Sequence, residues 1–139
     1  MPLRILSFGA GVQSTTVLLM SIRGDLPRID HALFADTGWE PGYVYEHLKW
    51  CEAQASAAGI QLTRVSCGRS LRADIDRWQF NGQTGRFVTM PLHLVMPDGT
   101  RAMARRQCTR EYKVEPLDRE ARRLAGVQPR ARPKEILVE

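Results

Sequence analysis

The chain has 139 residues, 43% hydrophobic and 25% charged, with a formal net charge of +5. These values predict one globular domain with its own core and argue against disorder. No apolar run approaches the ~20 residues of a membrane helix and no signal peptide precedes the first predicted strand, so we expect a cytoplasmic protein without a membrane partner. The three cysteines are far apart, which argues against a disulfide framework and against a paired-cysteine zinc site.

The first half of the chain alternates short apolar runs with longer amphipathic segments. The predicted strands and helices are, in chain order, Arg4–Ser7, Gln13–Arg23, Ile29–Ala35, Tyr43–Ala58 and Ile60–Val65. Strands that alternate with helices through short connections are typical of a parallel sheet with right-handed crossovers. We therefore expect an α/β fold, a three-layer Rossmann-like parallel sheet with helices on both of its faces.

After Cys67 the pattern is less regular. The predicted elements are a helix over Ser70–Trp78, a hairpin whose strands Phe87–Met96 and Thr100–Ala104 flank a Pro-Asp-Gly turn, and a helix over Val114–Leu124. The basic stretch 105–110 between them is expected to be irregular. Residues 127–139 are expected to be a linker and the start of a further strand, so the sheet is expected to be incomplete at its C-terminus unless this run pairs with another chain in a homodimer.

Positive charge is concentrated in the last third of the chain. Between Arg101 and Lys134 the sequence has eleven Lys or Arg and four Asp or Glu. Such a tract favours an anionic partner, which includes nucleotide phosphates, sulfate and a nucleic acid backbone. Ordinary solvated charges on helices and loops explain the same arginines equally well.

A glycine-rich turn, SFGAGVQST over residues 7–15, joins the first predicted strand to the first helix. A Walker A loop would need a lysine after the glycines, and a dinucleotide fingerprint would need a third glycine where Ser14 stands. The remaining phosphate loop is one in which backbone N–H groups, a helix N-terminus and hydroxyls bind pyrophosphate. An ordinary strand-to-helix turn is the alternative interpretation.

A second polar stretch, Asp36-Thr37-Gly38, follows the next predicted strand. The C-terminal ends of parallel strands meet at one edge of the sheet, where ligands bind in such folds. The two stretches are therefore expected to lie close together, although a helix-capping turn would also explain the second one.

Three stretches together resemble the phosphoadenosine phosphosulfate reductase family of the PP-loop ATP pyrophosphatase (adenine nucleotide α-hydrolase) superfamily. They are the glycine loop from Ser7, the Phe34–Gly38 run with Tyr43 and Tyr45 after it, and the Cys108–Leu117 segment with its Cys-x-x-x-x-Lys-Val-x-Pro pattern. The resemblance covers residues 4 to about 117. It implies that residues 1–126 form a PP-loop nucleotide-binding domain of the adenine nucleotide α-hydrolase type.

The resemblance also implies roles for individual residues. Lys113, with Arg110 or Arg106, would face the anionic end of the substrate, and the catalytic candidates are Lys113, Arg110 and Asp36. The ligand would be ATP, accompanied by Mg²⁺, or phosphoadenosine phosphosulfate. No metal-binding residues are assigned. The nucleotide-binding candidates are Ser7, Phe8, Gly9, Gly11, Gln13, Ser14, Thr15, Phe34, Asp36, Thr37, Gly38 and Arg106.

Departures from the family pattern direct the choice of reaction. Family reductases use a cysteine in a Glu-Cys-Gly-type tail, which is not found before Glu139, and three cysteines cannot supply a four-cysteine iron–sulfur cluster. We therefore expect cleavage of ATP between the α- and β-phosphates and adenylation of an acceptor, for which a nucleic acid is one candidate. Two alternatives stay open, a sulfonucleotide reductase that lacks its catalytic tail and a non-catalytic module that binds nucleotide or nucleic acid.

Overall fold

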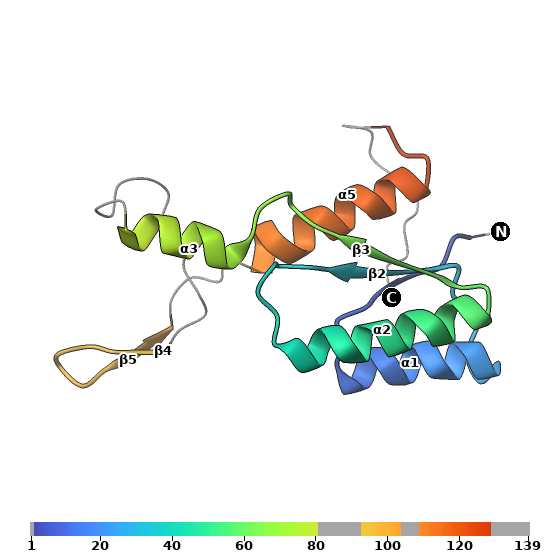
Figure 1. Ribbon diagram of the computed structural model, residues 1–139, viewed down its shortest axis with the longest axis horizontal. Helices are drawn as coiled ribbons and strands as arrows, with labels where there is room; N and C mark the ends of the chain where they lie inside the picture. Colours follow the sequence, from blue (N-terminus) through green and yellow to red (C-terminus); the bar gives the residue numbers. More distant parts are fainter. Residues whose placement is uncertain (1, 81–92, 104–108, 129–139) are drawn as a thin grey trace.

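The computed structural model describes residues 2–80, 93–103 and 109–128 (Figure 1). These residues form a three-stranded parallel sheet with helices, and a separate two-stranded hairpin. The elements are β1 (Ile5–Ser7), α1 (Val12–Arg23), β2 (His31–Ala35), α2 (Gly42–Ala57), β3 (Gln61–Val65), α3 (Leu71–Phe80), β4 (His93–Val95), β5 (Arg101–Met103), the π-helical turn η1 (Arg110–Val114) and α5 (Glu115–Leu124).

The parallel sheet has the strand order β1-β2-β3, with β2 in the centre. Ile5 of β1 pairs with His31 of β2, which in turn pairs with Gln61 of β3. The last four residues of β2 are all buried, as expected for a central strand with both faces covered. The predicted α/β fold with a parallel sheet is thus confirmed.

Helices cover both faces of this sheet, as predicted (Figure 1). On one face α1 and α2 bury the main core, in which Phe34 of β2 packs with Leu18 and Leu48 of the two helices. On the other face α5 packs Ala121 against Ile5 and Leu33. The alternation of side chains along a strand explains why Leu33 and Phe34 lie in different cores.

The predicted boundaries in the first half of the chain agree with the structure to within two residues. The largest difference is the start of β2, which is His31 rather than Ile29. The backbone N–H of Ile29 donates to Ser21 Oγ of α1 at 2.8 Å, and that of Asp30 donates to the carbonyl of Arg4 at 2.9 Å. These contacts hold both residues in the connection before the strand.

The predicted helix over Val114–Leu124 agrees with α5 to within one residue, but the helical turn that precedes it was not predicted. Helical structure is already present at Arg110, where the chain forms the π-helical turn η1 and then continues into α5. The N–H of Glu115 donates to the carbonyl of Arg110, five residues earlier, which is the π-helical spacing. Pro116 lies in the first turn of α5, as predicted.

Tyr112 fixes η1 to the region after β3. Its side chain is fully buried against Leu71, and its hydroxyl donates to the carboxylate of Asp74 on α3. The guanidinium of Arg69 lies 5.5 Å from the centre of the Tyr112 ring and 3.4 Å from the carboxylate of Glu111. Burial and the bond to Asp74 raise the pKa of Tyr112 above its ordinary value, so the protonated phenol, which donates to Asp74, is further favoured.

The predicted hairpin is confirmed for the residues that the structure describes. β4 and β5 pair antiparallel around the turn at residues 97–99, and Asp98 accepts hydrogen bonds from the backbone and side chain of Thr100. The predicted strand residues 87–92 and 104 lie outside the described ranges, as do residues 129–139 of the expected linker and further strand. In the described residues, none of the helices is long and apolar enough to cross a membrane.

The Tyr112 contact leads to a prediction about stability. Tyr112→Phe removes the hydroxyl that bonds Asp74 and should lower the free energy of unfolding by about 1–3 kcal/mol. Tyr43→Phe is the matched control, because the Tyr43 side chain is exposed on α2, and it should change little. Urea denaturation followed by circular dichroism measures both; equal effects would contradict the anchoring role of Tyr112.

Candidate functional site

The C-terminal ends of the three parallel strands and the N-termini of α1, α2 and α5 lie at the same edge of the parallel sheet, on the side toward α3 (Figure 1). The glycine loop leaves β1 at this end, and the Asp36-Thr37-Gly38 turn leaves β2. The structure therefore places both stretches at the same edge of the sheet, as the sequence predicts.

The glycine loop makes a tight turn between β1 and α1. Phe8 is buried in the main core, and its N–H donates to the carbonyl of Leu33 at 2.8 Å. Ala10 has a φ of +56°, a left-handed conformation that is uncommon for a residue with a side chain. A Cβ added at Gly9 or Gly11 would meet no other heavy atom of the described residues within 4 Å. The loop therefore leaves open space above both glycines.

The N-terminus of α1 faces this space. Gly11 is the N-cap, and the first α-helical bond runs from the N–H of Thr15 to the carbonyl of Gly11 at 3.0 Å. A glycine N-cap has no side chain to accept from the N–H groups of the first turn, which are orphan donors at any helix start. Gln13 is exposed and Ser14 is partly buried. The first turn can therefore offer N–H groups and the positive end of the helix dipole to an anion.

The Thr15 side chain contacts the neighbouring helix α2. Its hydroxyl lies 2.9 Å from Nε2 of His47, which is also 3.4 Å from the Cys51 thiol. The ring of Trp50 stacks on His47 with the centroids 5.8 Å apart. Burial raises the pKa of the Cys51 thiol, so the protonated form is favoured. Thr15 thus couples the start of α1 to α2, a role that the sequence analysis did not assign.

The turn after β2 is held by side-chain hydrogen bonds. Asp36 Oδ1 accepts from the Gly38 N–H and from the Tyr45 hydroxyl, each at 2.8 Å. Burial, followed by the bond to Asp36, raises the pKa of Tyr45. Thr37 is buried and donates from Oγ1 to Oε1 of Glu40 at 3.1 Å. The Phe34 side chain, like that of Phe8, is buried in the core, so only backbone atoms of these two candidates remain available to a ligand.

Lys113 is brought to this turn from the far part of the chain. Its Nζ lies 3.3 Å from Oε1 of Glu40. The side chain of Arg110 is more exposed, and its Nε lies 3.3 Å from Oε1 of Glu115. Arg106 and Cys108 lie outside the described residues. The sequence analysis did not select Glu40 as a candidate. The available signal was an acidic residue between the Asp-Thr-Gly turn and Pro41, which precedes α2.

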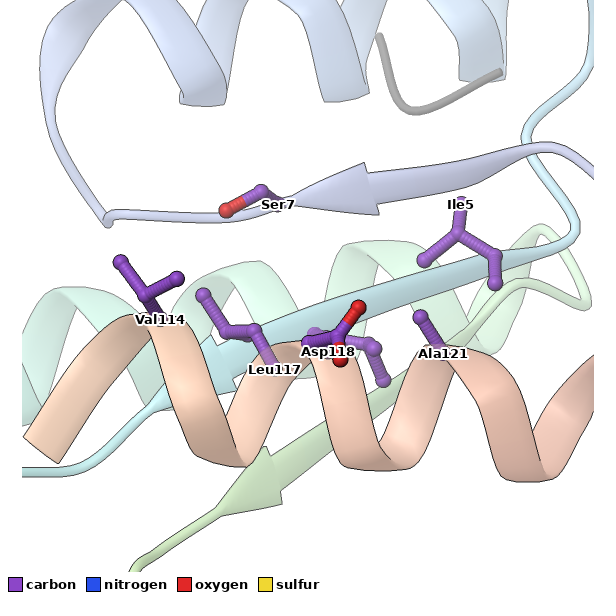
Figure 2. A pocket seen from close by; sticks show the side chains of 7 residues that line it. Ile5, Ser7, Val114, Leu117, Asp118 and Ala121 are labelled. Carbon is purple, nitrogen blue, oxygen red and sulfur yellow. The ribbon is translucent and has the colours of Figure 1, made fainter. Parts of the chain in front are cut away.

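A pocket of about 270 Å³ lies between β1 and the helical segment formed by η1 and α5 (Figure 2). Ser7 lines it from β1, and Val114 and Leu117 line it from the facing helical segment. The Ser7 hydroxyl is therefore on the face that α5 covers, whereas α1 lies on the opposite face. The remaining lining residues are Ile5, Leu33, Asp118 and Ala121.

The chain matches no protein-family model, no curated protein and no solved structure. Within the described ranges, no three His, Cys, Asp or Glu side chains are grouped as a metal site.

The turn at Gly38 yields a second stability prediction. Gly38 has a φ of +73°, and an added Cβ would lie 3.0 Å from Ser70 Cβ and 3.1 Å from its backbone Cα. Gly24 has a similar φ of +85° but open space around it. Gly24→Ala should cost about 1 kcal/mol for the left-handed backbone alone, and Gly38→Ala should cost more because Ser70 must move. Equal shifts in the urea midpoint would contradict the close approach.

Proposed function

We propose that this chain is a PP-loop protein that binds an adenine nucleotide and cleaves ATP between its α- and β-phosphates to adenylate an acceptor. The observation that carries the proposal is the 3.3 Å distance between Lys113 Nζ and Glu40 Oε1. This contact brings a cation from the Cys108–Leu117 segment, one of the three stretches that resemble the family, to the Asp-Thr-Gly turn at the end of β2. The glycine loop is another of the three stretches that resemble the family, and it follows β1, the neighbour of β2, at the same edge of the sheet.

The geometry of the loop supports phosphate binding. A polyphosphate needs close backbone approach and several N–H donors, and the space above Gly9 and Gly11 together with the first turn of α1 meets both needs. Lys113 would stabilise negative charge that develops as the phosphoanhydride bond breaks. Bound Mg²⁺ would neutralise phosphate oxygens. Arg110 would have to leave Glu115 before it could join Lys113.

The arrangement of the turn after β2 supports a nucleoside beside it. Asp36 is held by the Gly38 N–H and Tyr45, which gives its carboxylate one orientation at the strand end. A carboxylate fixed in this way is suited to accept from a ribose hydroxyl. In this proposal the full sheet has the Rossmann-like layout of the adenine nucleotide α-hydrolases, with the nucleotide across the ends of β1 and β2.

The open space at Gly11 provides the test of nucleotide binding. Gly11 has a φ of −90°, so a valine side chain fits the backbone, and its Cβ would project into space that the ligand needs. Gly11→Val should leave the free energy of unfolding within about 1 kcal/mol of wild type, as for a surface substitution. It should reduce ATP affinity at least about tenfold. Isothermal titration calorimetry with Mg²⁺ and ATP measures the affinity.

Ala57→Val is the control, because Ala57 is exposed at the other end of α2 and its substitution should not change ATP affinity. A parallel titration with phosphoadenosine phosphosulfate determines which nucleotide the site prefers. Pyrophosphate release from ATP, measured with candidate acceptors that include tRNA and DNA, tests the reaction. Unchanged ATP affinity in Gly11→Val, or in Gly11→Val combined with Ser14→Ala, would contradict the phosphate-loop proposal.

A further inference from the structure

Glu40 is held more firmly than its ion-pair partner Lys113. Its Oε1 accepts from the buried Thr37 hydroxyl at 3.1 Å, and its N–H donates to the Tyr45 hydroxyl at 3.4 Å. The Glu40 side chain is 18% exposed, whereas that of Lys113 is 48% exposed. The ammonium group of Lys113 is carried on a flexible four-carbon stem. When an anion approaches, the ammonium group can therefore turn toward it while the carboxylate stays in place.

We propose that Glu40 competes with the phosphates of the ligand for Lys113 and thereby lowers the affinity of this site for polyanions. The inference rests on the proposed function, because it takes Lys113 as the group that faces the phosphates. The ligand must weaken an ion pair whose atoms are 3.3 Å apart, and its own negative charge is repelled by Glu40. Both effects oppose binding, and both depend on the Glu40 charge.

Glu40→Gln is the direct test, because glutamine keeps the length of the side chain and an oxygen that accepts from Thr37 but loses the charge. The protein is titrated with ATP, inorganic tripolyphosphate and adenosine. Glu40→Gln should bind both polyphosphates about fivefold more tightly. This gain is at the upper end of what one partly exposed ion pair contributes to an equilibrium. Adenosine carries no phosphate, so its affinity should not change.

Glu120→Gln is the matched control. Glu120 lies on α5, pairs with Arg123 at 2.6 Å and interacts with His31 at the opposite end of β2. The substitution changes the net charge by the same amount as Glu40→Gln but removes no charge beside Lys113. It should leave all three affinities unchanged, and a gain equal to that of Glu40→Gln would show a general charge effect and overturn the inference.

Lys113→Met separates competition for the ammonium group from simple repulsion. If Glu40 acts through Lys113, Glu40→Gln should give a gain below about twofold when it is added to Lys113→Met, because coupled residues are not additive. A gain that persists in full in this background would overturn the inference. No gain in the single variant would overturn it as well.

The three ligands also distinguish this inference from the proposed function. Tight ATP binding without a gain in Glu40→Gln would refute the role of Glu40 and leave nucleotide binding supported. A gain for tripolyphosphate with no preference for ATP would support the role of Glu40 and contradict an adenine-nucleotide site. If neither wild type nor Glu40→Gln binds either polyphosphate, both proposals are wrong.

Discussion

The central position of β2 is the constraint on which the rest of the structure depends. Its backbone pairs with β1 on one edge and with β3 on the other, and all three strands run parallel. Leu33 packs under α5, whereas Phe34 packs under α1 and α2, so the strand is covered on both faces. Because the strands are parallel, their C-terminal ends share one edge, and the glycine loop and the Asp36 turn lie there for this reason.

Contacts between distant segments complete the candidate site at that edge. Tyr112 is buried against the region after β3, which fixes the π-helical turn and places the next residue, Lys113, beside Glu40. Glu40 is itself held by Thr37. The cation is therefore positioned by two anchors, one on each side, although its own side chain is half exposed. In the proposed function, an anionic ligand at this strand end would meet Lys113 and would compete with Glu40 for its ammonium group.

The sequence predicted the part of the fold that local patterns encode. Apolar runs and amphipathic periods located β1 to β3, α1 and α2 because burial on one or both faces repeats with the period of the element. The start of η1 at Arg110 was missed, since a π-helical turn has no such period and its anchor is a single residue, Tyr112. Ala10 was missed as well, because its left-handed backbone is set by the turn rather than by its residue type.

The sequence by itself determined the parallel α/β sheet, the glycine loop at the end of β1 and the polar turn at the end of β2. These features follow from residues that are close in the chain, where periodicity and backbone preferences act directly. Only the tertiary structure decided that Thr15 contacts His47 and that Lys113 lies beside Glu40. Such contacts depend on how helices pack on the sheet, because packing brings together side chains whose sequence separation carries no signal of their distance.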